Sequence, residues 1–407
     1  MAGGQGQPAN ENSYAGSRSA GLARLLCVVL LFGVMLTQIP LVSAHDGTEM
    51  AGLSQWHGIL VILGGLLFTG GMIFLKRTYR TSPTAALYGV FFGLVVTVLG
   101  VILFEGLTPD RVYTASSMPF PRSWYPPLAL SIGLLIAILS FIIGGLRWPD
   151  RPRYAVFGLL MGLWVSYPYL IPGPASNSHP LGYALVLVTP LLVGYIIWRD
   201  VWGVLQVVLR DPVVRRFGIG IGSLVGLFFM AVSGYISFFF EEGTPHETAV
   251  AILPVNYQLV TWPTLEVALP QIPLFFALSV GILTIVGSLS LLVGLNAALV
   301  ARHWRVEERA GMTEGTAGTA ALMGACTCGC CGPLVAKVAV LAAGPSIAAP
   351  LYWIFVDSAS PLGSLFIIAS IGLFTGSLVY SVGKAKDPGR SISVVPSAEL
   401  RREDEQS

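Results

Sequence analysis

The sequence predicts an all-α, polytopic membrane protein with about ten transmembrane helices. Hydrophobic residues make up 54% of the 407-residue chain and charged residues only 11%, whereas a soluble domain usually carries about a quarter charged residues. Backbone groups in lipid must be hydrogen-bonded internally, so long apolar runs are expected to be helices; a barrel would show short alternating strands instead. Ten runs are each roughly long enough for the ~30 Å hydrocarbon layer, at residues 22–42, 56–75, 85–104, 126–146, 154–171, 182–198, 217–240, 272–300, 317–343 and 362–383.

The start of the chain has two interpretations. Residues 1–20 are rich in Gly, Asn, Ser and Gln and predict a disordered tail. Segment 21–44 is either a signal peptide, cleaved after the small residues Val42-Ser43-Ala44, or a first anchor helix, since its apolar part is long for a signal. Ten spans therefore become nine if this segment is removed. We expect a transmembrane helical domain over residues 45–384 and a disordered cytoplasmic tail over residues 385–407.

Individual segments of the chain lead to further predictions about spans, helix packing and connections. Run 154–171 is the weakest span, because it is short and contains Pro168. Gly158/Gly162 and Gly218/Gly222/Gly226 have the four-residue spacing that lets helices approach closely. We interpret segment 200–214 as an amphipathic helix along the inner surface and segment 241–271 as the longest outer connection.

The distribution of basic residues predicts the orientation. Short cytoplasmic loops retain Lys and Arg. With the N-terminus inside, 23 basic residues divide so that only Arg111 and Arg122 fall outside and only Lys337 lies within a span. The division predicts a cytoplasmic C-terminus, because a missed or additional helix would exchange the two sides beyond it.

A cysteine cluster is the most unusual feature of the chain. Four of the five cysteines fall within six residues of the ninth run, namely Cys326, Cys328, Cys330 and Cys331. Close thiolates suit soft or borderline ions such as Cu(I), Hg(II) or Zn(II). Cys326/Cys330 and Cys328/Cys331 have helical spacings that place each pair on one face. Buried cysteines are also common as small apolar residues, and that interpretation stays open beside metal binding.

The same segment resembles MerT-type mercuric-ion transport proteins. Cys330-Cys331-Gly332-Pro333-Leu334-Val335 is similar to the first helix of that family, and Ser360-Pro361-Leu362 to the start of its returning helix. The resemblance covers residues 317–383, a Cys-rich helix pair, and implies passage of a soft metal ion by thiol exchange. The register differs from the family pattern, because alignment on Gly332-Pro333 leaves only Cys330 at a family cysteine position.

Histidines and acids gather on the predicted outer face. His45, His57 and His246 are candidate metal ligands there, and His45 would become the N-terminal residue after cleavage. Acidic residues outnumber the two arginines on this face and should attract cations. Solvated loop charge explains the same pattern without any metal, since the exclusion of basic residues alone leaves acids in excess.

These observations favour transport or handling of a soft metal ion. The alternatives are a membrane thiol-disulfide oxidoreductase and a non-catalytic membrane subunit of a larger complex. No nucleotide-binding or Ser/His/Asp pattern is evident. The sequence therefore leaves enzymatic activity open, and we expect a protein that is not an enzyme. A Cu, Hg or Zn ion is the only cofactor suggested. The expected partners are the lipid bilayer of the cell membrane, and an extracytoplasmic metal carrier or other membrane subunits, with no nucleic acid.

Overall fold

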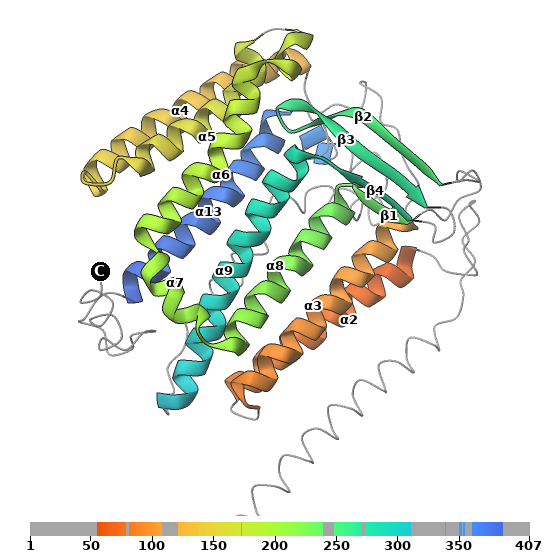
Figure 1. The fold of residues 1–407 in the computed structure, drawn as a ribbon, viewed down its shortest axis with the longest axis vertical. Helices are drawn as coiled ribbons and strands as arrows, with labels where there is room; N and C mark the ends of the chain where they lie inside the picture. Colours follow the sequence, from red (N-terminus) through yellow and green to blue (C-terminus); the bar gives the residue numbers. More distant parts are fainter. Residues whose placement is uncertain are drawn as a thin grey trace, which may run out of the picture.

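The chain forms a multi-pass helical membrane bundle. The computed structural model describes residues 55–78, 81–107, 121–171, 173–238, 248–269, 274–310 and 360–385, together with Val338, Pro350, Leu351, Trp353 and Ile354. Within these residues seven helices are long and apolar enough to cross a membrane. They are α2 (Gln55–Arg77), α3 (Pro83–Gly106), α4 (Tyr125–Arg147), α6 (Pro180–Asp200), α8 (Pro212–Val232), α9 (Val280–Ala310) and α13 (Pro361–Ala385) (Figure 1). The predicted spans at 22–42 and 317–343 lie outside the described residues, apart from Val338, as do both predicted tails, apart from Ala385.

Two further helices are too short or too polar to count among these spans. Run 154–171 is a helix, α5 (Arg153–Leu170), with Pro168 inside it. It is less apolar than the seven spanning helices, and it packs in the bundle beside α4 and α6. The predicted inner-surface segment contains the short helix α7 (Trp202–Leu209), which buries Val204, Leu205, Val207 and Val208 and exposes Trp202. That division between a buried face and an exposed residue is the one expected of an interfacial helix.

Helix α9 is the central element of the bundle. It contacts α3, α6, α7, α8 and α13, and it has the most buried apolar window of the seven spanning helices. Figure 1 shows α9 between α8 on one side and α6 and α13 on the other, with the α2–α3 and α4–α5 hairpins at the two edges. Leucines, isoleucines and Phe141 of α4 remain exposed, as expected for a surface that faces lipid.

The two ends of the bundle differ in character. A four-stranded antiparallel sheet covers one end, which we call the sheet end (Figure 1). Helices α2, α4, α6, α9 and α13 all run away from it, so their C-terminal ends gather at the opposite end. The last turns of α2, α4 and α6 carry Lys76, Arg77, Arg147 and Arg199 there. We call this opposite end the basic end.

The sequence did not predict this sheet. Its strands are β1 (Ile236–Phe238), β2 (Ala249–Tyr257), β3 (Val260–Leu269) and β4 (Leu274–Leu278), in the order β1-β4-β3-β2. Strands β2 and β3 form a hairpin in the segment interpreted as a plain outer connection. Its turn holds Gln258 at φ 59°, a conformation that usually selects glycine or asparagine. The side chain of Tyr183 in α6 fastens the sheet to the bundle, because its hydroxyl donates to the Thr261 carbonyl at 2.5 Å.

The sheet also moves two predicted span boundaries. Run 217–240 is a helix only to Val232, where Ser233 and Gly234 end it, the latter at φ 75°. Run 272–300 becomes helical only at Val280. In the described remainder of the two runs, Ile236–Phe238 forms β1 and Leu274–Leu278 forms β4, and these two strands pair with each other. Hydropathy could not separate these parts, because a strand of Ile, Phe and Leu is as apolar as the adjoining helix.

The glycine spacings are packing devices, as predicted. A Cβ added at Gly218 would lie 2.9 Å from Ala298 Cβ and from the Gly294 carbonyl oxygen of α9, and one at Gly222 would lie 2.9 Å from the Ser290 carbonyl oxygen. In the α4–α5 hairpin a Cβ on Gly162 would collide with the Gly133 backbone. Helices can approach this closely only where no side chain intervenes.

Candidate functional site

The structure describes one of the seven predicted metal ligands. His57 lies in the first turn of α2 at the sheet end and is partly exposed. His45, His246, Cys326, Cys328, Cys330 and Cys331 lie outside the described residues, so the predicted site stays a prediction. Among the described residues, no group of three or more His, Cys, Asp or Glu side chains is placed to hold a metal ion.

The described residues do fix where the chain enters and leaves the cysteine-bearing segment. Helix α9 ends with Ala310 at the basic end, and α13 begins with Pro361 at the sheet end (Figure 1). Trp353, only 7% exposed, also lies at the sheet end. The Arg122 guanidinium is 5.4 Å from its ring centre, and Arg122 itself lies just before the start of α4 at that end. Residues 311–352 therefore connect opposite ends of the bundle.

A buried polar contact joins the two helices that flank this segment. Asn296 of α9, 8% exposed, donates from Nδ2 to the Leu292 carbonyl at 2.8 Å and to the Phe374 carbonyl of α13 at 3.1 Å. This contact confirms the interhelical role that its position in an apolar span suggests. Next to Phe374, the buried Thr375 hydroxyl has no hydrogen-bond partner in the described part of the chain.

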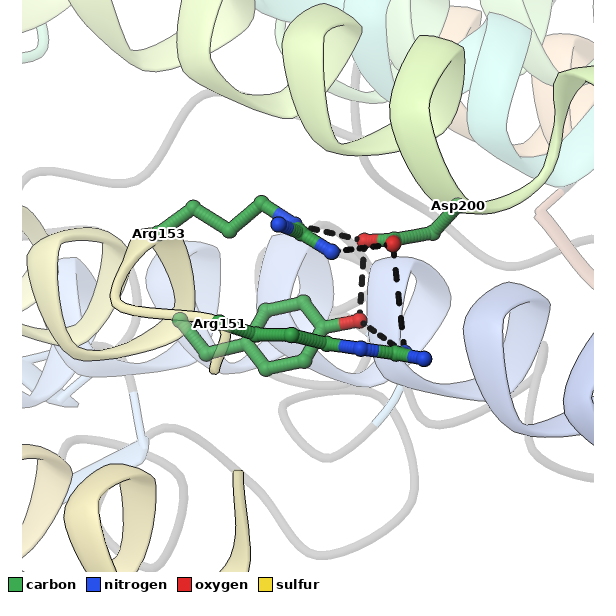
Figure 2. A network of polar contacts seen from close by, with 4 residues as sticks. Arg151, Arg153 and Asp200 are labelled. Atoms are coloured by element: carbon green, nitrogen blue, oxygen red, sulfur yellow. Dashed lines mark hydrogen bonds and ion pairs between the residues drawn. The ribbon is translucent and has the colours of Figure 1, made fainter. Parts of the chain in front are cut away.

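Asp200 anchors a polar network at the basic end (Figure 2). Arg153 donates to both carboxylate oxygens, with Nε 2.9 Å from Oδ2, and the Tyr154 hydroxyl donates to Oδ2 at 2.8 Å. Arg151 Nη1 lies 3.8 Å from Oδ1. The Asp200 side chain is only 6% exposed. With these donors the carboxylate has little capacity for a ligand, so the network ties the start of α5 to the end of α6.

Asp211 anchors a second network, eleven residues further along the chain. Its Oδ1 accepts the Val213 backbone N–H at 3.0 Å and so caps α8. Its Oδ2 lies 3.3 Å from Arg305 Nε and 3.9 Å from Arg302 Nη1, both on α9. Asp200 and Asp211 thus hold the two ends of α7 to different helices. From the sequence alone, the arginines of both networks count only as cytoplasmic charge. The signal that could have revealed the ion pairs is an aspartate at the end of an apolar run, in a region rich in basic residues.

Comparison with models of protein families, with curated proteins and with solved structures finds no match.

Proposed function

We propose that this membrane protein handles a soft metal ion through Cys326, Cys328, Cys330 and Cys331. One observation carries the proposal: four thiols stand within six residues of an apolar segment, and the helices on either side of that segment meet it at opposite ends of the bundle. A segment that connects the two ends and contains 27 largely apolar residues, 317–343, is long enough to cross the bilayer as a helix, at about 1.5 Å per residue.

Thiols at this density favour particular ions. Cu(I), Hg(II) and Zn(II) bind thiolate sulfur well, whereas Mg²⁺ and Ca²⁺ require oxygen ligands. In a helix, Cys326 and Cys330 would share one face, and Cys328 and Cys331 would share a neighbouring face. Gly332 and Pro333 directly follow and permit a kink, which lets thiols from adjacent faces turn toward one ion.

The MerT-like pattern gives the proposal a mechanism. In that family the vicinal-cysteine helix is followed by a returning helix with a proline near its start. Here the predicted return is a helix, α13, which begins at Pro361 and buries Ser360 immediately before it. We propose that the ion passes between thiols by exchange. Cys330 is the principal acceptor, because it alone occupies a family cysteine position.

The direction of passage follows from the charge at the two ends. The basic end is assigned to the cytoplasm by the rule that short cytoplasmic loops retain Lys and Arg. His57 then lies on the outer side, where the sequence also predicts His45 and His246. We propose that these imidazoles and the outer acids collect the ion and that the cysteines pass it inward. An extracytoplasmic carrier would deliver the ion to this side.

Metal stoichiometry of the full-length protein tests the proposal. The chain is purified under reducing conditions in detergent and titrated with Cu(I), Zn(II) or Hg(II), and bound metal is measured after desalting. We expect one of these ions to be retained by the wild type and lost in the Cys330→Ser/Cys331→Ser variant. Cys27→Ser, in the chain that retains residues 21–44, is the matched control, since it makes the same chemical change outside the cluster. Cys330→Ser alone should weaken retention more than Cys331→Ser.

Transport in cells separates the remaining alternatives. Expression should change cellular content of the bound metal, and the double variant should abolish the change. Equal metal retention by the double variant and by Cys27→Ser would contradict the proposal. A mixed disulfide trapped at Cys328 or Cys331 in the absence of metal would instead identify a thiol-disulfide oxidoreductase.

A further inference from the structure

Among the residues whose side chains the structure describes, the basic end buries more positive than negative charge where α8 begins and α9 ends. The side chains of Asp211, Arg302 and Arg305 are only 7%, 10% and 17% exposed. In this described set one carboxylate faces two guanidinium groups. A charge that is removed from water without a full partner is strongly destabilising, so an excess cation in this position calls for a compensating anion.

The hydrogen bonds of the cluster are also incomplete. Arg302 Nε, and Arg305 Nε and Nη1, are buried and have no hydrogen-bond acceptor within the described residues. Asp211 fills these positions only in part. Its Oδ1 accepts the Val213 N–H, and its Oδ2, which has no hydrogen bond of its own, lies 3.3 Å from Arg305 Nε and 3.9 Å from Arg302 Nη1, so Arg302 Nε and Arg305 Nη1 are left over. Unfilled donors on charged groups are more costly than unfilled neutral ones.

The neighbouring element adds positive charge. Lys76, in the last turn of α2, places its ammonium group 5.1 Å from the ring centre of Trp304, which stands between the two arginines in sequence. Cations from α2 and α9 therefore meet at the basic end. Basic sites between transmembrane helices suit anionic headgroups.

We propose that Arg302 and Arg305 bind a phosphate group, supplied either by an anionic lipid headgroup or by a soluble phosphate compound. Arg302 and Arg305 are three residues apart and so lie on the same side of α9. Two guanidiniums match the tetrahedral oxygens of phosphate through paired, charge-assisted hydrogen bonds. Arg305, the more exposed of the two, provides the approach from the membrane surface. The site is independent of the cysteine cluster.

Binding to the purified, delipidated full-length chain tests this site. Native mass spectrometry and the thermal unfolding midpoint are recorded with phosphatidylglycerol, with zwitterionic phosphatidylcholine and with inorganic phosphate. The Arg302→Gln/Arg305→Gln variant should bind the anionic ligand at least about tenfold more weakly, since loss of even one charge-assisted hydrogen bond accounts for that factor. Arg215→Gln/Arg216→Gln is the control, because it removes two exposed arginines from the same end.

Asp211→Asn keeps the proposal falsifiable if the double variant folds poorly. Asparagine preserves the helix cap but removes the carboxylate that competes with phosphate for both arginines. We therefore expect this variant to bind phosphate at least about tenfold more tightly, which is the gain from one freed guanidinium. Stabilisation by phosphatidylglycerol alone identifies a lipid headgroup, and stabilisation by inorganic phosphate identifies a soluble ligand. Binding of neither, equal losses in the two double variants, or no gain in Asp211→Asn would overturn the proposal.

Discussion

Replacement of Gly222 by alanine tests the close approach of α8 and α9. A Cβ at this position would lie 2.9 Å from the Ser290 carbonyl oxygen, about 0.5 Å short of ordinary contact at 3.4 Å, and the obstacle is backbone that cannot rotate away. The helices must separate, and overpacking of this kind costs about 1–3 kcal/mol. Gly287→Ala is the matched control on α9, because a Cβ there meets nothing within 4 Å. It should be neutral or raise stability by about 0.5–1 kcal/mol through helix propensity.

Reversible unfolding in detergent micelles with increasing dodecyl sulfate measures both variants. The nine tryptophans of the chain report the transition by fluorescence. We expect the free energy of unfolding of Gly222→Ala to lie about 1–4 kcal/mol below that of Gly287→Ala. Equal stability of the two variants would refute the reasoning, because it would mean that the two backbones are further apart than a methyl group requires.

Three more substitutions test other contacts by the same measurement. Asp200→Asn should cost about 3 kcal/mol, because it leaves buried guanidinium charge without a counter-ion, whereas the exposed Asp150→Asn should change stability by less than about 0.5 kcal/mol. Asn296→Ala should cost about 1 kcal/mol through loss of its contact with α13. Burial raises the pKa of Tyr235 to about 12. The stability that the neutral Tyr235 hydroxyl contributes is therefore complete below pH 10 and lost as the pH rises through about 12. Tyr235→Phe should remove this loss of stability at alkaline pH. An unchanged decrease in the free energy of unfolding above pH 10 would contradict this.

The helices of the bundle were predictable because the lipid environment constrains the sequence of every span in the same way. A span must be apolar over its length and helical in its backbone, so hydropathy alone places α2, α3, α4, α6 and α13. Basic residues then orient successive helices, because every loop repeats the same constraint. The weak span α5 was recognised for the same reason, although Pro168 and its two polar ends lower its hydropathy.

The sheet and the ion pairs were not predictable, for two different reasons. The strands β1 and β4 are apolar enough to read as extensions of α8 and α9, and their pairing joins residues about 40 positions apart. No local pattern reports such a contact. For the ion pairs, the rule that places arginines at the basic end says nothing about which of them meets an aspartate. That choice depends on helix packing, which brings Arg305 of α9 to the first residue before α8.

The charge at the basic end bears on how a metal ion would leave the protein. Exposed arginines, namely Arg147, Arg199, Arg215 and Arg216, create a positive environment at this end, which opposes the exit of a free hydrated cation. A soft ion bound by thiolates carries a different charge: Cu(I) with two thiolates is an anion, and Hg(II) with two is neutral. The field at the basic end therefore disfavours release of the bare ion and favours its departure as a thiolate complex. Transfer to an incoming thiol, the step implied by the MerT-like pattern around Cys330, is thus the form of exit that the electrostatics of the bundle permit most readily.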